Sequence, residues 1–235
     1  QYHYIVICVA KMVLGENMTV CDISIVNGSI VDGTGDPKWE GNVGIKDGRI
    51  VSLGGDVRAA KQTIDAEGKI VSPGFVDIHT HYDAQLLWDQ AMSISPWHGV
   101  TTVVIGNCGF GIAPTRRIHR ELILRTLERV EGMSFAALNK GLGEEWGYET
   151  FPEYLDLIED KGTAINVGVL LGHTPIRFEA MGEDAVRRES SPEEMKMMKN
   201  IVREGMEVGG LGFATSQAPT HHGFEGHPVP SRLAS

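Results

Sequence analysis

The chain has 235 residues, a formal net charge of −10 and 42% hydrophobic residues, which is the composition of an ordinary globular protein. The negative charge disfavours a nucleic-acid partner, and no apolar run reaches the roughly 18 residues that a membrane helix needs, so no membrane partner is expected. Three widely spaced cysteines, Cys8, Cys21 and Cys108, form no disulfide framework and indicate a reducing, cytoplasmic compartment.

The N-terminal residues precede the first clear strand pattern. An apolar stretch at 4–10 is short and lacks a basic segment before it, so it is a poor signal peptide. Alternation of apolar and polar residues begins at Met18. We therefore expect Met18 to be the natural start and residues 1–17 to be a non-native or disordered leader.

Residues 18–72 read as short strands separated by turns. Asn27-Gly28 predicts a hairpin turn, Asp47-Gly48 predicts a second one, and Glu67-Gly68 marks a third turn. About 50 residues make a thin core for an independent domain, so this segment should pack on another part of the protein. We expect it to form a small β-sandwich or meander.

After Pro73 the pattern changes to strands alternating with helices. Capping boxes at Thr150-Glu153 and Ser191-Glu194 predict helices that begin at 151 and 192. A third helix is expected at 116–130, with Ile118, Leu122 and Leu127 facing inward. The predicted strands lie at 74–79, 100–106, 164–171 and 210–215.

These strands are nearly continuous in apolar residues, which is typical of a parallel sheet covered on both faces. Both a (β/α)8 barrel and an open doubly wound sheet fit such repeated units. Polar residues follow the predicted strands at their C-terminal ends, where barrel enzymes place their sites. The barrel is therefore favoured, and no glycine-rich dinucleotide fingerprint supports the other fold. Only about four β/α units are present, so residues 73–235 are expected to be the first half of a barrel of eight.

The strongest functional signal is the pair His79 and His81 at the end of the first of these strands. Side chains alternate along a strand, so both imidazoles should point to the same side and can hold one metal ion. Asp83 follows and has the chemistry to support a ligand histidine or to cap the next segment. Cys108 follows the second strand between glycines, where both a metal-ligating thiolate and a small buried side chain are possible.

These segments resemble a known family. Residues 72–83, 99–102 and 106–111 are similar to the corresponding motifs of the amidohydrolase superfamily, and within it to the D-aminoacylase (N-acyl-D-amino-acid deacylase) branch. The resemblance runs from about Met18 to the end of the chain. It implies an α/β fold, namely a partial TIM-like (β/α)8 metal-dependent hydrolase barrel preceded by a β-sandwich segment that both chain ends complete.

The resemblance also implies a chemistry. His79, His81 and Cys108 would be metal ligands, with one tightly held zinc near a second, weaker divalent metal position. The small-molecule substrate would be an N-acylated D-amino acid, whose amide bond is hydrolysed. Further ligand histidines and the aspartate that acts as general acid/base would lie beyond Ser235, so the catalytic residues of this chain stay unknown.

Several other polar residues are weaker candidates. His173, after the third strand, either lines the pocket or bonds the local backbone, and Arg177 is expected to form a surface ion pair rather than to bind a substrate carboxylate. In the loop 214–229, His221 and His222 are expected to face substrate or solvent rather than a metal. Characterised deacylases resembling this chain tend to carry a tyrosine in that loop, which leaves the substrate identity open.

Two rival functions remain. A cyclic amide or ureide hydrolase, or an isoaspartyl dipeptidase, would share the fold, but such relatives commonly use a carbamylated lysine. No lysine lies near the ends of the second, third or fourth predicted strands, which favours the cysteine branch. The other rival is a catalytically incomplete fragment, because a half-barrel leaves strand edges open. The oligomeric state is left open.

Overall fold

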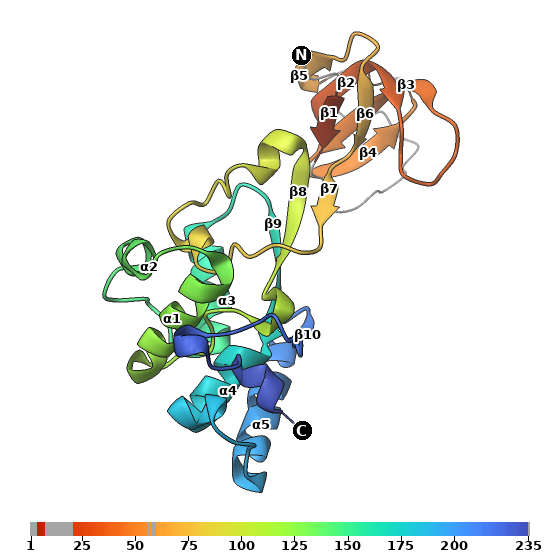
Figure 1. The fold of residues 1–235 in the computed structure, drawn as a ribbon. Helices are drawn as coiled ribbons and strands as arrows, with labels where there is room; N and C mark the ends of the chain where they lie inside the picture. The colour runs from red at the N-terminus through yellow and green to blue at the C-terminus, as the bar shows by residue number, and fades with distance from the viewer. Residues whose placement is uncertain (1–3, 8–20, 56, 58–59, 235) are drawn as a thin grey trace. The chain divides into compact units, whose positions relative to one another are not determined.

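The computed structural model describes residues 4–7, 21–55, 57 and 60–234, and these divide into two compact units (Figure 1). The first unit is Gln1–Phe75 and the second is Val76–Ser235. Tyr4–Ile7 of the expected leader form strand β1, which pairs with a later strand. The other leader residues and the proposed start at Met18 lie outside the described residues. The division of the chain at 72/73 stays a prediction.

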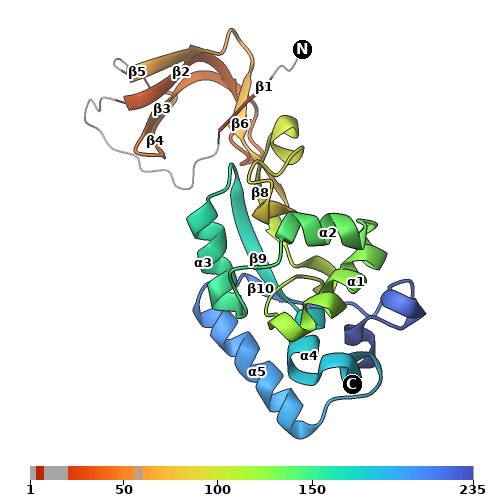
Figure 2. The ribbon, with the colours of Figure 1, turned by 90° about the vertical axis from the view of Figure 1, so that its left-hand side faces the viewer.

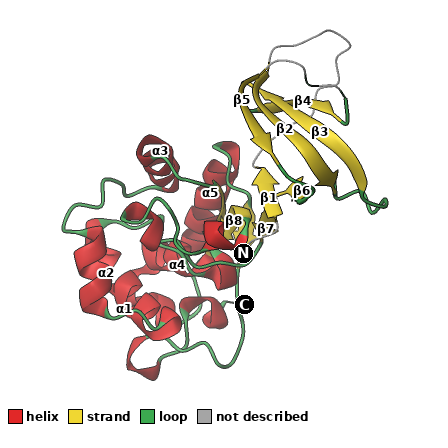
Figure 3. Ribbon diagram, turned by 90° about the horizontal axis from the view of Figure 1, so that it is seen from above, coloured by secondary structure: helices red, strands yellow, loops and turns green. Residues whose placement is uncertain are grey.

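The described strands of the first unit form one six-stranded sheet (Figure 3). Its order is β1-β6-β2-β3-β4, with β5 paired to β2. Buried aliphatic side chains of β2, β3 and β6 make its small core. A second sheet is not among the described strands of this unit, so the sandwich stays a prediction. The strands are β1 (Tyr4–Ile7), β2 (Cys21–Ile30), β3 (Trp39–Lys46), β4 (Arg49–Leu53), β5 (Ala60–Asp65) and β6 (Ile70–Pro73).

The hairpin turn predicted at Asn27-Gly28 is wrong. Asn27 has the left-handed φ of 55° that the pattern suggested, but β2 continues through it and pairs with β3 on both sides. The register shifts between Ile25 and Gly28, so the residue is part of a β-bulge. Its side chain donates to Asp65 on β5 over 3.0 Å, which holds the bulge without reversing the chain. The turn at Asp47-Gly48 does join two antiparallel strands, β3 and β4, as predicted.

The second unit is mixed α/β and contains a four-stranded sheet in the order β10-β9-β8-β7. The pairs β8–β9 and β9–β10 are parallel, so neighbours in sequence are neighbours in the sheet, as expected for repeated β/α units. The C-terminal ends of these strands therefore meet at one edge. The strands are β7 (Phe75–Asp77), β8 (Val100–Ile105), β9 (Asn166–Gly172) and β10 (Gly212–Ala214).

Five α-helices are described in this unit, and in Figure 2 α3 and α5 lie on one side of β9 and α1 and α2 on the other. Both predicted capping boxes are present, at Thr150 before α3 and at Ser191 before α5. Two helices, α2 and α4, were not predicted. None of the described helices is long and apolar enough to cross a membrane. The helices are α1 (Arg120–Glu131), α2 (Phe135–Leu142), α3 (Phe151–Lys161), α4 (His173–Met181) and α5 (Pro192–Glu207).

Two burial predictions fail at the ends of elements. Ile118, expected to face inward, is 75% exposed, because it lies in a 3₁₀ turn ahead of α1 and so outside the 3.6-residue period of that helix. Leu127 in the helix proper is buried as predicted. The first strand, expected to be buried, is exposed at Val76 and Ile78. It is short and forms the edge of the described sheet, so no further strand covers its outer side.

Candidate metal centre

The histidine pair lies just beyond β7, in a segment fixed by the residue between them. Thr80 is buried, and its backbone N–H and its hydroxyl both donate to the Val104 carbonyl oxygen, over 3.1 and 2.8 Å. The backbone N–H of His79 donates to the Asp77 carboxylate over 3.1 Å. Because Thr80 is directed into the sheet, the histidines on either side of it point away from the sheet and toward Cys108.

Asn107 clamps this segment to the end of β8. Its buried amide nitrogen donates to the carbonyl oxygens of Val104, at 2.8 Å, and Thr80, at 3.3 Å. These hydrogen bonds thereby join the segment that carries the histidines to the turn that carries Cys108. Sequence reasoning treated Asn107 only as part of a motif. The usable signal was a polar amide at a strand end beside a glycine, since a buried amide there must find backbone partners.

The turn that carries Cys108 has an unusual backbone. Cys108 itself has a left-handed φ of 56°, and Gly109 follows with a φ of 74°. A Cβ atom on Gly109 would lie 2.9 Å from the Cα of Thr215 at the end of β10, well inside ordinary contact. Only glycine lets these two strand ends approach so closely. The turn that carries Cys108 and the end of β10 are therefore in close contact at this edge of the sheet.

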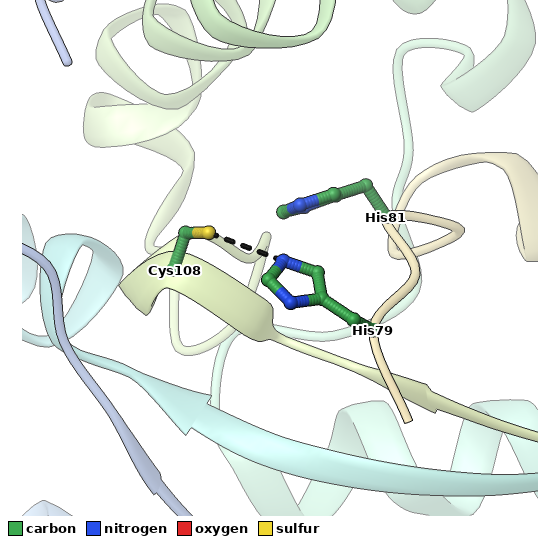
Figure 4. Close-up of side chains that lie close together, drawn as sticks. All are labelled: His79, His81 and Cys108. Atoms are coloured by element: carbon green, nitrogen blue, oxygen red, sulfur yellow. Dashed lines mark hydrogen bonds between the residues drawn. The ribbon is translucent and has the colours of Figure 1, made fainter. Parts of the chain in front are cut away.

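The structure brings His79, His81 and Cys108 together (Figure 4). One ligand atom from each lies within 4.8 Å of the others, and the Cys108 Sγ is 3.3 Å from the His79 Nε2. Zinc bound tetrahedrally by imidazoles and a thiolate separates its ligand atoms by about 3.3–3.6 Å. His79 is exposed and the other two are half-buried. The donor set thus suits a zinc ion that solvent can reach, and the distance between Cys108 and His79 already matches the spacing of zinc ligands.

The environment keeps the second histidine neutral. Burial lowers the pKa of His81 first, and the charges of His79 and His221 lower it further. A neutral imidazole retains the lone pair that a metal ion needs. The ring of Phe110, with its centroid 6.3 Å from that of His81, forms an apolar wall beside the site. Phe110 was another site residue that sequence reasoning did not single out.

Asp83 is buried close to this segment. Its backbone carbonyl accepts a hydrogen bond of 2.8 Å from the Tyr154 hydroxyl of α3. Burial raises the pKa of Tyr154 well above its usual value, and the charge of Asp83 raises it further, so the phenol remains a donor. The expected contact between the Asp83 carboxylate and a ligand histidine stays a prediction.

His173 is not part of the three-residue cluster. Its Nδ1 lies 2.9 Å from the Thr215 hydroxyl, and its ring centroid is 5.2 Å from that of Phe213 on β10. Burial, followed by the charge of Arg177, lowers the pKa of His173 to about 4. The imidazole is therefore neutral and bridges α4 to the end of β10. Whether it also touches substrate stays a prediction.

The surface ion pair predicted for Arg177 is wrong. Arg177 is fully buried within the second unit, and its Nη2 donates to the carbonyl oxygens of Ala185 and Arg188, over 3.3 and 3.0 Å. The helix α4, which the sequence pattern missed, turns this side chain inward toward the chain that follows it. Burial is the main cause that lowers the pKa of Arg177.

The structure separates the histidines in the loop after β10. His221 is half-buried, with its ring centroid 5.2 Å from that of Phe110 and its Nδ1 2.8 Å from the Ser216 hydroxyl. His222 is exposed and contributes an isolated backbone bridge with Pro228. His227 is also exposed. Of the predicted substrate residues, His221 is thus the one that shares the Phe110 wall with the three-residue cluster.

Comparisons with known proteins point to the same family as the sequence motifs. A family model described as "Amidohydrolase family" matches residues 62–233. D-aminoacylase from Alcaligenes xylosoxydans xylosoxydans is 31% identical over 195 residues, which are 83% of this chain and 37% of that protein. Among solved structures, a D-aminoacylase with a binuclear metal centre superposes with a TM-score of 0.73 at 29% identity, covering 92% of this chain and 40% of that one.

A second solved structure extends the comparison. N-acyl-D-glutamate deacylase from Bordetella bronchiseptica, in complex with zinc and a phosphonate inhibitor, superposes with a TM-score of 0.67 at 32% identity. The match covers 88% of this chain and 40% of that protein. The chain thus spans roughly two fifths of the length of the relatives it matches. The family model covers most of the chain, and the chain belongs to the amidohydrolase family.

Proposed function

We propose that this chain is the metal-binding N-terminal part of a zinc-dependent enzyme that hydrolyses the amide bond of N-acyl-D-amino acids. The observation that carries the proposal is the cluster of His79, His81 and Cys108 at adjoining strand ends. Two imidazoles and a thiolate form a donor set that suits zinc. The similarity to D-aminoacylase, over more than four fifths of the chain, supports this substrate class.

The proposal includes a fold larger than the one described. The edge strands β7 and β10 would each pair with further strands to close a TIM-like barrel, and the sheet of the first unit would become part of a β-sandwich. We take residues 18–72 as the sandwich segment, 73–235 as the first half of the barrel, and 1–17 as a leader. A cytoplasmic location is proposed from the odd number and wide spacing of the cysteines.

We propose one tightly bound zinc, with a second, weaker divalent metal position beside it. When bound, zinc polarises the scissile carbonyl and lowers the pKa of a water molecule. His79 and His81 would hold it through neutral nitrogens and Cys108 through its thiolate. The Thr80 and Asn107 hydrogen bonds keep these ligands in place. An aspartate beyond Ser235 would carry the proton to the leaving amine, because no residue of the cluster is suited to that task.

The substrate would be a small N-acylated amino acid that enters at the C-terminal strand ends. We propose that His173, His221 and His222 line its path. The loop that carries the latter two follows β10 directly, and His221 lies against the Phe110 wall of the cluster. No nucleic-acid or membrane partner is proposed.

The test uses the full-length protein. Zinc content and hydrolysis of N-acetyl-D-amino acids, with the L-enantiomers as a comparison, are measured for the wild type, Cys108→Ala and Cys21→Ala. Cys21 is a buried cysteine of the first unit, so its variant controls for loss of a thiol. We expect Cys108→Ala to lose most of its zinc and at least about a hundredfold in activity, with Cys21→Ala unaffected. Full zinc and full activity in Cys108→Ala would refute the ligand role.

The fragment alternative is tested in the same assay. The 235-residue chain alone is compared with the full-length protein at equal zinc loading. The proposal predicts that the short chain is inactive because it lacks the proton carrier. Substantial turnover by the short chain would mean that its own residues carry the proton, and would overturn this part of the proposal.

A further inference from the structure

Hydrogen bonds within the loop after β10 hold His221 in a defined position. The imidazole Nδ1 of His221 lies 2.8 Å from the Ser216 hydroxyl, and its backbone N–H donates to the Ala218 carbonyl over 3.0 Å. The following 3₁₀ turn ties the loop down from the other side. There, the Ser231 hydroxyl donates to the Ser216 carbonyl over 2.6 Å, and Arg232 donates to the His221 carbonyl over 3.1 Å. The Ser216 hydroxyl thus holds the ring itself, and the other three hydrogen bonds hold the backbone on which the ring is carried.

The same ring reaches the wall of the candidate metal centre. Its centroid is 5.2 Å from that of Phe110, and Phe110 in turn faces His81 at 6.3 Å. Phe110 is buried and follows Cys108 by two residues, so it cannot swing away independently of the ligand turn. His221 and the predicted zinc ligand His81 thus both lie beside the same aromatic ring. A small substrate bound at the metal centre would therefore lie near His221.

The hydrogen bonds of Ser216 favour one tautomer of the neutral His221 ring. The backbone N–H of Ala218 donates to the Ser216 Oγ over 3.2 Å, so this oxygen already accepts one hydrogen bond. Among the described contacts of this hydroxyl, the His221 Nδ1 is the atom that can accept its proton. We assign the neutral tautomer with the proton on Nε2 from this network. The free end of the ring is accordingly a hydrogen-bond donor.

We propose that His221 is a substrate-contacting residue, whose Nε2–H donates a hydrogen bond to a carboxylate oxygen of the N-acyl amino acid bound at the metal centre. Ser216 is its positioning residue, because it sets the tautomer and the ring orientation. This inference rests on the proposed function. A carboxylate fits the position because a neutral N–H donor bonds most strongly to a charged acceptor.

The experiment measures kcat and KM of the full-length, zinc-loaded enzyme on an N-acetyl-D-amino acid. The variants are His221→Ala, His221→Gln, Ser216→Ala, Ser216→Thr and His227→Ala. His227 is an exposed histidine of the same loop with no place in the proposed machinery, so its variant is the matched control. Zinc content and thermal unfolding are followed for all five variants.

We expect His221→Ala to raise KM about tenfold or more, with kcat changed less than about threefold and zinc content unchanged. Gln keeps an N–H donor near the Nε2 position, so His221→Gln should recover part of this loss. Ser216→Ala should raise KM several-fold, and Ser216→Thr, which keeps the hydroxyl, should restore it. The control variant should match the wild type. If His221→Ala fails to fold, His221→Gln and the Ser216 pair carry the comparison.

The outcomes separate this inference from the proposed function. An active wild type whose His221 and Ser216 variants keep the KM of His227→Ala would overturn the inference alone. Loss of kcat at constant KM would also overturn it, since that pattern reports an interaction made only in the transition state. A zinc-loaded wild type with no deacylase activity would overturn the proposed function, and this inference with it.

Discussion

Replacing Gly109 by alanine should loosen the candidate metal centre without touching a proposed ligand. Gly109 has a φ of 74°, and a Cβ atom there would lie 2.9 Å from the Cα of Thr215 and 3.0 Å from the carbonyl oxygen of Ala214. Ordinary contacts between carbon atoms are about 3.5–4.0 Å. Both neighbours are backbone atoms, so they cannot rotate away. The turn or the end of β10 must therefore move by at least about 0.5 Å.

Two separate effects should lower the free energy of unfolding of Gly109→Ala. A non-glycine residue with a left-handed backbone costs roughly 1–2 kcal/mol, and overpacking adds about 1–3 kcal/mol. The first cost applies equally at Gly132, which ends α1 with a φ of 68° and has nothing within 4 Å of a Cβ. Gly132→Ala is therefore the matched control. The difference between the two variants in free energy of unfolding should be about 1–3 kcal/mol.

The same movement should also lower the affinity for zinc. Metal–ligand distances tolerate only about ±0.2 Å, so a shift of half an ångström beside Cys108 should weaken zinc binding about tenfold or more. The assay is competition with a chromogenic chelator, together with denaturant unfolding, on the full-length protein. Equal zinc affinity in Gly109→Ala and Gly132→Ala would show that the close approach of the strand ends does not position the thiol.

Two further predictions concern stability. The folded-state pKa of His173 is about 4, below the value near 6.5 of a free imidazole, so the unfolded chain takes up the proton first as pH falls. The free energy of unfolding should therefore fall as the pH is lowered from about 6.5 to 4. The loss should be at most about 2–3 kcal/mol, because solvent screens this half-buried ring. His173→Gln should make the free energy of unfolding, measured by denaturant titration, depend less on pH in this range. Thr150→Ala removes the side chain that caps α3, whose hydroxyl accepts a hydrogen bond from the Glu153 N–H. The free energy of unfolding should fall by about 1 kcal/mol in the same titrations. An unchanged midpoint would mean that other contacts hold this end of α3.

Periodicity and capping residues made it possible to predict the strands of the second unit and two of its helices from the sequence. Each of the four predicted strands has a counterpart in the sheet, and the helices α3 and α5 begin at their capping boxes. These features depend on residues within one turn or one strand of each other. The helix α4 was missed because it begins directly at the end of β9, at His173, with no side-chain cap to mark it.

What the sequence left undetermined depends on contacts between distant segments. Asn27-Gly28 has hairpin chemistry, but the partner strand β3 continues past it and the turn becomes a bulge. Arg177 gave no sign of burial, because the carbonyl oxygens that receive it come from residues after the unpredicted helix. His79 and Cys108 could be named as candidates from their motifs. Their 3.3 Å approach, by contrast, depends on side chains such as Asn107 that bond across strands.

The Val104 carbonyl oxygen links the two segments that carry the proposed metal ligands. It accepts hydrogen bonds from the backbone and hydroxyl of Thr80 and from the amide of Asn107, so three donors share one acceptor. Release of the end of β8 would free all three donors together, and with them both ligand-bearing segments. Metal loss and local unfolding then become one cooperative event. The amide hydrogens of this edge should exchange with solvent as a group, and zinc should slow the exchange of all of them together.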